Sequence, residues 1–255
     1  MARPKKLVFI HIPKTAGTSL KNLLESNYAE DERLAIYNRE NLDEKLAAAL
    51  KDPKIRCIYG HFPLRPVVVE SDAVVVTLFR EPVARTISHY NHYKRGLNEE
   101  HRRIMEGVNS PEDFAKLPQG NNRQTAFISG HLKNADFFAD PHALERAMQN
   151  LQRIDFAGFT EHFNASIALF KKELGWKYAW SEHSNSGSKK NEADLETWRS
   201  LNELDLPLVD AAWDIFYPAV QVYEGKKINS RPGDPTLLEK IKYHLRVLSS
   251  KFRPK

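Results

Sequence analysis

The sequence has a single cysteine, Cys57, and this scarcity excludes both a disulfide framework and a zinc site built from several thiolates. Its longest apolar runs, such as residues 67–69 and 73–79, are far too short to cross a bilayer. Residues 1–6 carry no secretory-signal pattern and lead directly into a strand-like segment. Glycine and proline number only 11 and 14 among 255 residues, which excludes collagen-like and low-complexity classes. We therefore expect a cytoplasmic globular protein with no transmembrane segment.

The sequence also has only a small excess of positive over negative charge. Lysine and arginine total 38 against 33 acidic residues, so the net charge is +5 with histidine neutral. This small surplus favours anionic ligands, but no dense basic stripe with interleaved aromatics accompanies it, and nucleic acid is not expected as a partner. Basic residues concentrate only in residues 240–255, and a charge run of this kind is most often a solvated face.

The first third of the chain alternates strand and helix signals. Residues 7–12 and 73–79 are apolar, β-branched runs typical of strands buried on both faces, and residues 56–59 form a third, shorter candidate. Apolar residues then recur at helical spacing over residues 20–28, and proline opens a helix over residues 82–94. Strands separated by helices predict an α/β fold with a P-loop-like central parallel sheet flanked by helices.

The rest of the chain is predicted to be mainly helical. Helices are expected to begin after Ser110 and Asp140, each of which precedes a proline, and a further strand is expected at residues 154–159. Gly175 is placed to end the helix that follows this strand. The remaining predicted segments are a polar loop at 181–190, helices at 192–201 and 208–222, and a last helix at 237–248.

We interpret residues 1–225 as one domain, to which a basic C-terminal turn and helix, residues 226–255, are appended. The apolar side of that last helix requires a partner. The domain core and a second subunit of a homo-oligomer are the simplest partners, and an anionic membrane surface is the third.

The segment PKTAGTS, residues 13–19, joins the first predicted strand to the first helix. In a parallel α/β sheet this junction lies at the carboxyl end of a strand, where ligands usually bind. The unpaired N–H groups and positive dipole of the helix start attract an anion. Gly17 permits close approach of a phosphate, the hydroxyls of Thr18 and Ser19 donate hydrogen bonds, and Lys14 supplies a charge. Taken alone, the same residues also suit an ordinary turn in which Thr18 or Ser19 caps the helix.

The pattern differs from the loop of nucleotide-hydrolysing enzymes. That loop requires a first glycine and a lysine directly after the second one, whereas here Lys14 precedes Gly17. The strongest strand also ends in Arg80 instead of the aspartate that would hold magnesium in such enzymes. The residues favour an anion bound without a metal ion.

These residues resemble a known family. PKTAGTS is similar to the 5′-phosphosulfate loop of sulfotransferases that use 3′-phosphoadenosine 5′-phosphosulfate (PAPS), most of all the carbohydrate branch with heparan 2-O- and chondroitin enzymes and bacterial relatives. REPVARTIS, residues 80–88, resembles the 3′-phosphate motif of that family, an arginine at a strand end with a serine eight positions later. The resemblance spans roughly residues 7–174, with weaker echoes to about residue 224.

The resemblance implies PAPS as co-substrate and 3′-phosphoadenosine 5′-phosphate (PAP) as product. It also implies that a polar loop around Lys189 closes over the nucleotide, and a disordered surface loop is the alternative. A guanidinium suits a terminal phosphate, although a surface salt bridge is the alternative role for Arg80. The implied cofactor-binding residues are Lys14, Thr15, Ala16, Gly17, Thr18, Ser19, Arg80, Ser88 and Lys189.

Sulfuryl transfer requires a base for the acceptor hydroxyl and a stabiliser for the leaving phosphate, and we assign the second role to Lys14. His61 follows the second predicted strand and resembles the histidine taken as base in 2-O-sulfotransferase relatives. A structural histidine bonded to a loop carbonyl is the alternative. His11 is a second candidate for the base, although its place in a buried strand suits packing better. Glu161 and Glu81 are further candidates for the base, although Glu81 is better placed to cap the next helix.

The segment NNRQTAFISG, residues 121–130, resembles a family segment near the acceptor pocket. We assign Arg123 and Gln124 to acceptor binding. Ala126 stands where arginine is common in the family, which predicts a different acceptor unless Arg123 substitutes for that arginine.

The sequence therefore predicts a metal-independent, PAPS-dependent sulfotransferase acting on a hydroxyl of a carbohydrate or glycoconjugate. Its rivals are a divergent phosphotransferase that uses ATP and magnesium, and a non-enzymatic anion-binding module. The acceptor, the base and the oligomeric state stay open at this point.

Overall fold

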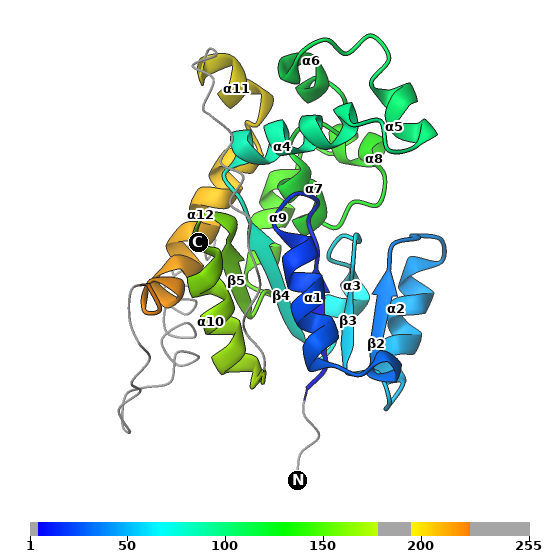
Figure 1. Cartoon of the computed structure of the whole chain (residues 1–255), viewed down its shortest axis with the longest axis vertical. Coiled ribbons are helices and arrows are strands. Elements are labelled where there is room, and N and C mark those ends of the chain that lie inside the picture. Colours follow the sequence, from blue (N-terminus) through cyan, green and yellow to red (C-terminus); the bar gives the residue numbers. More distant parts are fainter. Residues whose placement is uncertain (1–4, 178–194, 225–255) are drawn as a thin grey trace, which may run out of the picture.

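The computed structural model describes residues 5–177 and 195–224, and one parallel sheet forms its centre (Figure 1). The five strands are ordered β2-β3-β1-β4-β5. Leu7 on the central strand lies opposite Cys57 on one side and Val74 on the other. The strand bounds are β1 (Leu7–Ile10), β2 (Arg33–Ile36), β3 (Cys57–Gly60), β4 (Val74–Phe79) and β5 (Phe156–Phe159).

Helices connect the strands and fill most of the remaining described chain. The α-helices are α1 (Gly17–Asn27), α2 (Leu42–Lys51), α3 (Pro66–Val69), α4 (Pro82–Lys94), α5 (Glu99–Ile104), α6 (Pro111–Ala115), α7 (Arg123–Ile128), α8 (Asn134–Ala139), α9 (Ala143–Leu151), α10 (Phe163–Leu174), α11 (Leu195–Leu201) and α12 (Asp205–Gln221). The short 3₁₀ turns are η1 (Glu30–Glu32) and η2 (Thr160–His162).

The strand order places helices on both faces of the sheet. The connection through α1 runs from β1 outward to β2, and the connection through α2 returns from β2 to β3. Because parallel crossovers are right-handed, connections that run in opposite directions lie on opposite faces. Figure 1 shows the resulting arrangement, with α4 lying across the ends of the strands.

The core lies where the sequence has its continuous apolar runs. Every residue of β1, β3 and β5 is buried, and so is all of β4 after Val74. Helix α12 packs against β5 and against α7, α9 and α10, so the C-terminal part of the described chain belongs to the same core.

The predicted α/β fold with a central parallel sheet is confirmed. Strands appear in all four predicted segments, and α4 has the predicted bounds. Strand β2 was not predicted, because only Ile36 of its four residues is buried and an edge strand of this kind has no apolar pattern. The predicted helix at 208–222 begins earlier, at Asp205.

Several predicted segments lie outside the described residues: the loop at 181–190 with Lys189, the last helix at 237–248, and the appended segment 226–255. Over the described ranges, none of the helices combines the length and the apolar character that crossing a membrane requires.

Candidate active site

Polar and cationic side chains gather where β1 to β4 end. We call the loops after these four strands, residues 11–19, 37–41, 61–65 and 80–81, the loop edge. In a parallel sheet the carboxyl ends of neighbouring strands lie side by side. The phosphosulfate-type loop, His61 and the arginine motif are therefore brought to one edge although they are far apart in sequence.

The loop at residues 13–19 has a backbone shaped for an anion. Lys14 and Ala16 adopt positive φ angles of 75° and 60°, which turn the chain sharply before α1. The N-terminus of α1 receives no side-chain cap, so its first N–H groups remain able to bind an anion. Thr15 is fully buried, and its hydroxyl donates to the carbonyl of Ile12 at 2.8 Å, which holds the loop closed.

Gly17 is required for a reason that the sequence did not reveal, and its part in the approach of a phosphate stays a prediction. A Cβ atom at this position would lie 1.4 Å from Nε2 of His11. The imidazole of His11 thus occupies the space that any larger residue would need. His11 packs between the first residue of α1 and the ring of His61, whose centroid is 4.3 Å away.

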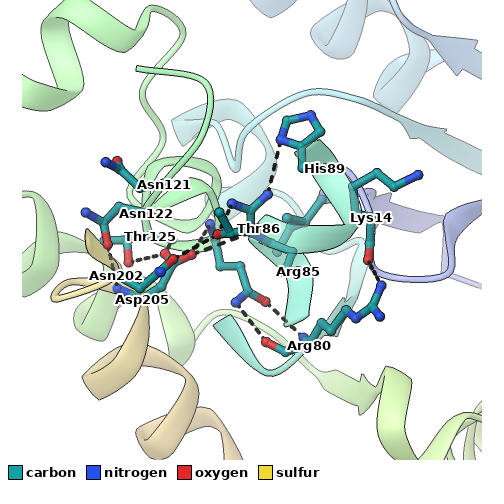
Figure 2. Close-up of polar contacts among 12 residues, drawn as sticks. Lys14, Arg80, Arg85, Thr86, His89, Asn121, Asn122, Thr125, Asn202 and Asp205 are labelled. Atoms are coloured by element: carbon teal, nitrogen blue, oxygen red, sulfur yellow. Dashed lines mark hydrogen bonds and ion pairs between the residues drawn. The ribbon is translucent and has the colours of Figure 1, made fainter. Parts of the chain in front are cut away.

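Arg80 connects the two predicted anion motifs (Figure 2). Its Nη1 donates to the main-chain carbonyl of Lys14 at 3.1 Å. Its Nε is buried and has no hydrogen-bond partner among the described residues. A buried donor without a partner is costly, and a phosphate oxygen would satisfy it. Glu81 caps α4 as expected, because its carboxylate accepts from the N–H groups of Val83 and Ala84.

Cations dominate the surroundings of Lys14. Burial, followed by the positive charges of Arg95 and Arg80, lowers the pKa of Lys14 below its ordinary value. Burial also lowers the pKa of Arg80, and Glu161 and Glu81 offset part of that effect. Clustered cations of this kind favour the binding of a multiply charged anion.

His61 lies in the same group with its ring nitrogens available. Burial, then Arg39, His92 and Lys14, lowers the pKa of His61 to about 4, so its imidazole is neutral at physiological pH. Within the described chain the ring forms no hydrogen bond, and only the main-chain carbonyl of His61 is bound, by Nε of Arg39 at 2.8 Å. A neutral imidazole is able to accept a proton from a hydroxyl.

Two arginines lie on the ring of Phe127, and one of them, Arg39, also binds the main-chain carbonyl of His61. The guanidinium carbon of Arg39 is 5.1 Å and that of Arg123 is 5.3 Å from the ring centroid. Arg123 is only 8% exposed and donates to the side chain of Asn134. Neither arginine has a carboxylate partner in the part of the chain that the structure describes.

The remaining predicted residues are placed as follows. Gln124 is fully buried, and its amide is bound to the backbone of Arg80: Oε1 accepts from the N–H, and Nε2 donates to the carbonyl, both at 2.9 Å. Its side chain is thus engaged with Arg80, and its assignment to the acceptor stays a prediction. Ser88 is half-buried on α4, two turns beyond Arg80. Lys189 lies outside the described residues.

A family model described as "Sulfotransferase family" matches residues 1–206, which include the whole loop edge. The chain belongs to the sulfotransferase family. The predicted family is thereby confirmed, whereas the finer assignment to a 2-O or chondroitin branch of bacterial type stays a prediction.

Curated relatives carry the name heparan-sulfate 6-O-sulfotransferase. Type 1 of Cricetulus griseus is 27% identical over 180 residues, which cover 57% of this chain and 45% of that protein. Type 2 of Gallus gallus is 25% identical over 186 residues, covering 60% of this chain and 46% of that protein. The matched region therefore spans less than half the length of these relatives.

One solved structure with a similar outline is mouse sulfotransferase SULT7A1 complexed with PAP. It aligns over 95% of this chain and 90% of that chain, at 14% identity and a TM-score of 0.43.

Sequence reasoning missed Arg39 and Arg95 as members of this site. Arg39 follows β2, and without that strand its position at the loop edge was hidden. Arg95 ends α4 and acts on Lys14 through space, for which the sequence contains no signal.

Proposed function

We propose that this protein transfers a sulfuryl group from PAPS to a hydroxyl group of a carbohydrate. The observation that carries the proposal is the contact between Arg80 and the carbonyl of Lys14, because it joins, at one edge of the sheet, the two segments that resemble the family's nucleotide motifs. The unsatisfied Nε of Arg80 and the cations around Lys14 suit a ligand with phosphates at two ends.

Each of the proposed site residues would have a separate role in the reaction. The acceptor oxygen forms a new bond to sulfur while its proton passes to an imidazole nitrogen of His61. The bond between sulfur and the bridging oxygen of the 5′-phosphate breaks, and its electron pair stays on the phosphate, which leaves as PAP. Lys14 compensates the charge that develops on that phosphate. Arg80, with Ser88, would hold the 3′-phosphate.

An acidic glycan suits the acceptor side. Arg39 adds positive charge beside His61, Arg123 lies on the same Phe127 ring as Arg39, and neither forms a salt bridge with a carboxylate of the described chain. The relatives named above act, by their names, on heparan sulfate. We also propose that His61 is used as in the 2-O-sulfotransferases and that the protein is cytoplasmic.

The direct test compares PAP, ADP and ATP by calorimetry, each with magnesium and with EDTA. We expect PAP to bind in EDTA and more tightly than ADP. A preference for ATP with magnesium would instead indicate a phosphotransferase. Binding of acidic polymers without nucleotide, weakening steeply with salt, would indicate an anion-binding module.

A second measurement addresses transfer itself. Radiolabelled PAPS is incubated with desulfated heparin, chondroitin and a neutral glycan, and label in the glycan is counted. We expect label in an acidic glycan, and at least about a hundredfold slower labelling with the His61→Ala variant. Tight PAP binding with no transfer to any hydroxyl would overturn the acceptor class while leaving the nucleotide site intact.

A further inference from the structure

Helices α7 and α12 begin side by side, and each caps the other (Figure 2). Neither helix has a capping side chain of its own. Oδ1 of Asn122, just before α7, accepts from the N–H groups of Leu204 and Asp205, both at 3.1 Å. In return the carboxylate of Asp205 accepts from the N–H of Gln124 at 3.2 Å and of Thr125 at 2.7 Å. Such bonds satisfy donors that a helix start otherwise leaves open.

Asp205 is fully buried and held by further partners. Its Oδ1 accepts from the hydroxyl of Thr125 at 2.8 Å, and its Oδ2 lies 3.9 Å from Nε of Arg85. Arg85 is itself fully buried at the start of α4 and donates to the carbonyl of Gly120. A buried carboxylate requires such compensation, so its negative charge and its hydrogen bonds act together to fix the first turn of α7.

The first turn of α7 in turn holds the backbone of Arg80. Gln124, the second residue of that helix, binds both the N–H and the carbonyl of Arg80 through its side-chain amide. Arg80 then reaches the carbonyl of Lys14. An unbroken series of contacts therefore runs from Asp205 through Gln124 to the arginine at the loop edge.

A second tie joins the same regions independently. The hydroxyl of Thr86, on α4, donates to Oδ1 of Asn202 at 3.0 Å, and Asn202 lies just before α12. The segment that carries Asp205 is thus fixed to the helix that follows Arg80 as well as to α7. The start of α12 therefore contacts both α7 and α4.

We propose that Asp205 is a positioning residue for the 3′-phosphate site: by capping α7 from α12 it makes Gln124 hold Arg80 in the orientation that binds this phosphate. The proposal rests on the proposed function, because it assigns Arg80 to the nucleotide. In this role Asp205 acts on the 3′-phosphate through Gln124 and Arg80 and not by direct contact.

The test replaces Asp205→Asn and measures affinity for two ligands, PAP and adenosine 5′-monophosphate, which lacks the 3′-phosphate. The amide keeps the size of the carboxylate but loses its charge and one of its acceptor oxygens. We expect PAP affinity to fall by about tenfold, the equivalent of one lost charge-assisted contact, with little change for the monophosphate. Asp210→Asn, an exposed change on the same helix, should leave both affinities unchanged.

A double-variant cycle separates positioning from general damage. In an Arg80→Ala background the Asp205→Asn change should cause no further loss of PAP affinity, because the residue through which it acts is gone. Equal weakening of both ligands by Asp205→Asn, or full additivity with Arg80→Ala, would overturn the proposal.

A second variant keeps the inference testable if the Asp205→Asn protein does not fold. Gln124→Leu removes the contacts to Arg80 and leaves the cap of Asp205 on the α7 backbone in place. It should reproduce the selective loss for PAP, and an unchanged ratio of the two affinities would overturn the inference even if Asp205→Asn cannot be purified. Wild-type protein that fails to bind PAP would overturn the proposed function itself, and this inference with it.

Discussion

Nη1 of Arg80 lies 3.1 Å from the main-chain carbonyl oxygen of Lys14, although 66 positions separate the two residues in the chain. The contact fixes the spacing between the two cationic motifs before any ligand is bound. A ligand that touches both motifs therefore meets a site that is already formed, which lowers the entropic cost of binding.

Arg80→Lys should weaken PAP binding by at least about tenfold, because an ammonium replaces a fork of donors that suits a phosphate. The turnover rate at saturating PAPS should change less. Calorimetry with PAP measures the first effect. Arg56→Lys, at an exposed arginine paired with Glu32, is the matched control and should bind PAP normally. Unchanged affinity in the Arg80 variant would remove Arg80 from the nucleotide site.

Lys14→Ala should lower kcat by about a hundredfold or more, since the lysine acts on charge that appears only as the phosphate leaves. PAPS should still bind, because the backbone of residues 15–19 remains. Single-turnover kinetics with labelled PAPS separate the two effects. Lys21→Ala removes a lysine of α1 that pairs with Glu25 and should react at the wild-type rate. Near-normal turnover of the Lys14 variant would contradict the assigned role.

His61→Ala should lower kcat by about 10²- to 10⁴-fold, the usual contribution of a general base, with PAP affinity unchanged. Steady-state kinetics at saturating PAPS, with calorimetry for PAP, measure the two effects. The exposed His142 supplies the control, and His142→Ala should be fully active.

The pH profile of wild-type kcat/KM provides an independent check on His61. A base must be unprotonated, and burial together with Arg39, His92 and Lys14 lowers the pKa of His61 to about 4. The group therefore stays competent as the pH falls through about 6.5, where an ordinary histidine would lose half its activity. We expect a level profile from neutral pH to well below that value. Loss centred on the ordinary histidine pKa would contradict the burial and charge found around His61.

Gly17→Ala should destabilise the fold by about 3 kcal/mol, the upper end of what overpacking costs. The new methyl group would meet the ring of His11, whose Nε2 lies 1.4 Å from the Cβ position. Urea unfolding measures the loss. The double change His11→Ala with Gly17→Ala removes the obstacle and should be more stable than the sum of the two single effects. Strict additivity would show that His11 is not what excludes a side chain there.

Much of the sheet could be predicted because its central strands are buried on both faces. Residues 7–10 and 74–79 have no polar residue except Thr77, and short apolar runs of this kind are typical of strands in a helix-covered parallel sheet. Strand β2 is the opposite case. Arg33–Ile36 pairs on one side only and buries a single side chain, so nothing in its composition distinguishes it from a loop.

The sequence predicted the motifs of the loop edge but not the hydrogen bonds that join it to distant parts of the chain. Lys14, His61 and Arg80 each follow a strand signal, and parallel pairing alone brings them together. The cap that Asp205 places on α7 joins positions 80 residues apart. The apolar pattern of α12 starts at Leu208, after this aspartate, and a sequence contains no local sign of a cap supplied by another helix.

The mutual capping of α7 and α12 also has a consequence for how the protein is made. On the ribosome the strands and the phosphosulfate-type loop emerge first, and Gln124 emerges long before the carboxylate that steadies its helix. If Asp205 positions Arg80 as proposed, this arginine takes its binding orientation only after residue 205 has left the exit tunnel and α12 has docked. A fragment that stops short of that point would contain both cationic motifs and still lack the carboxylate that caps α7.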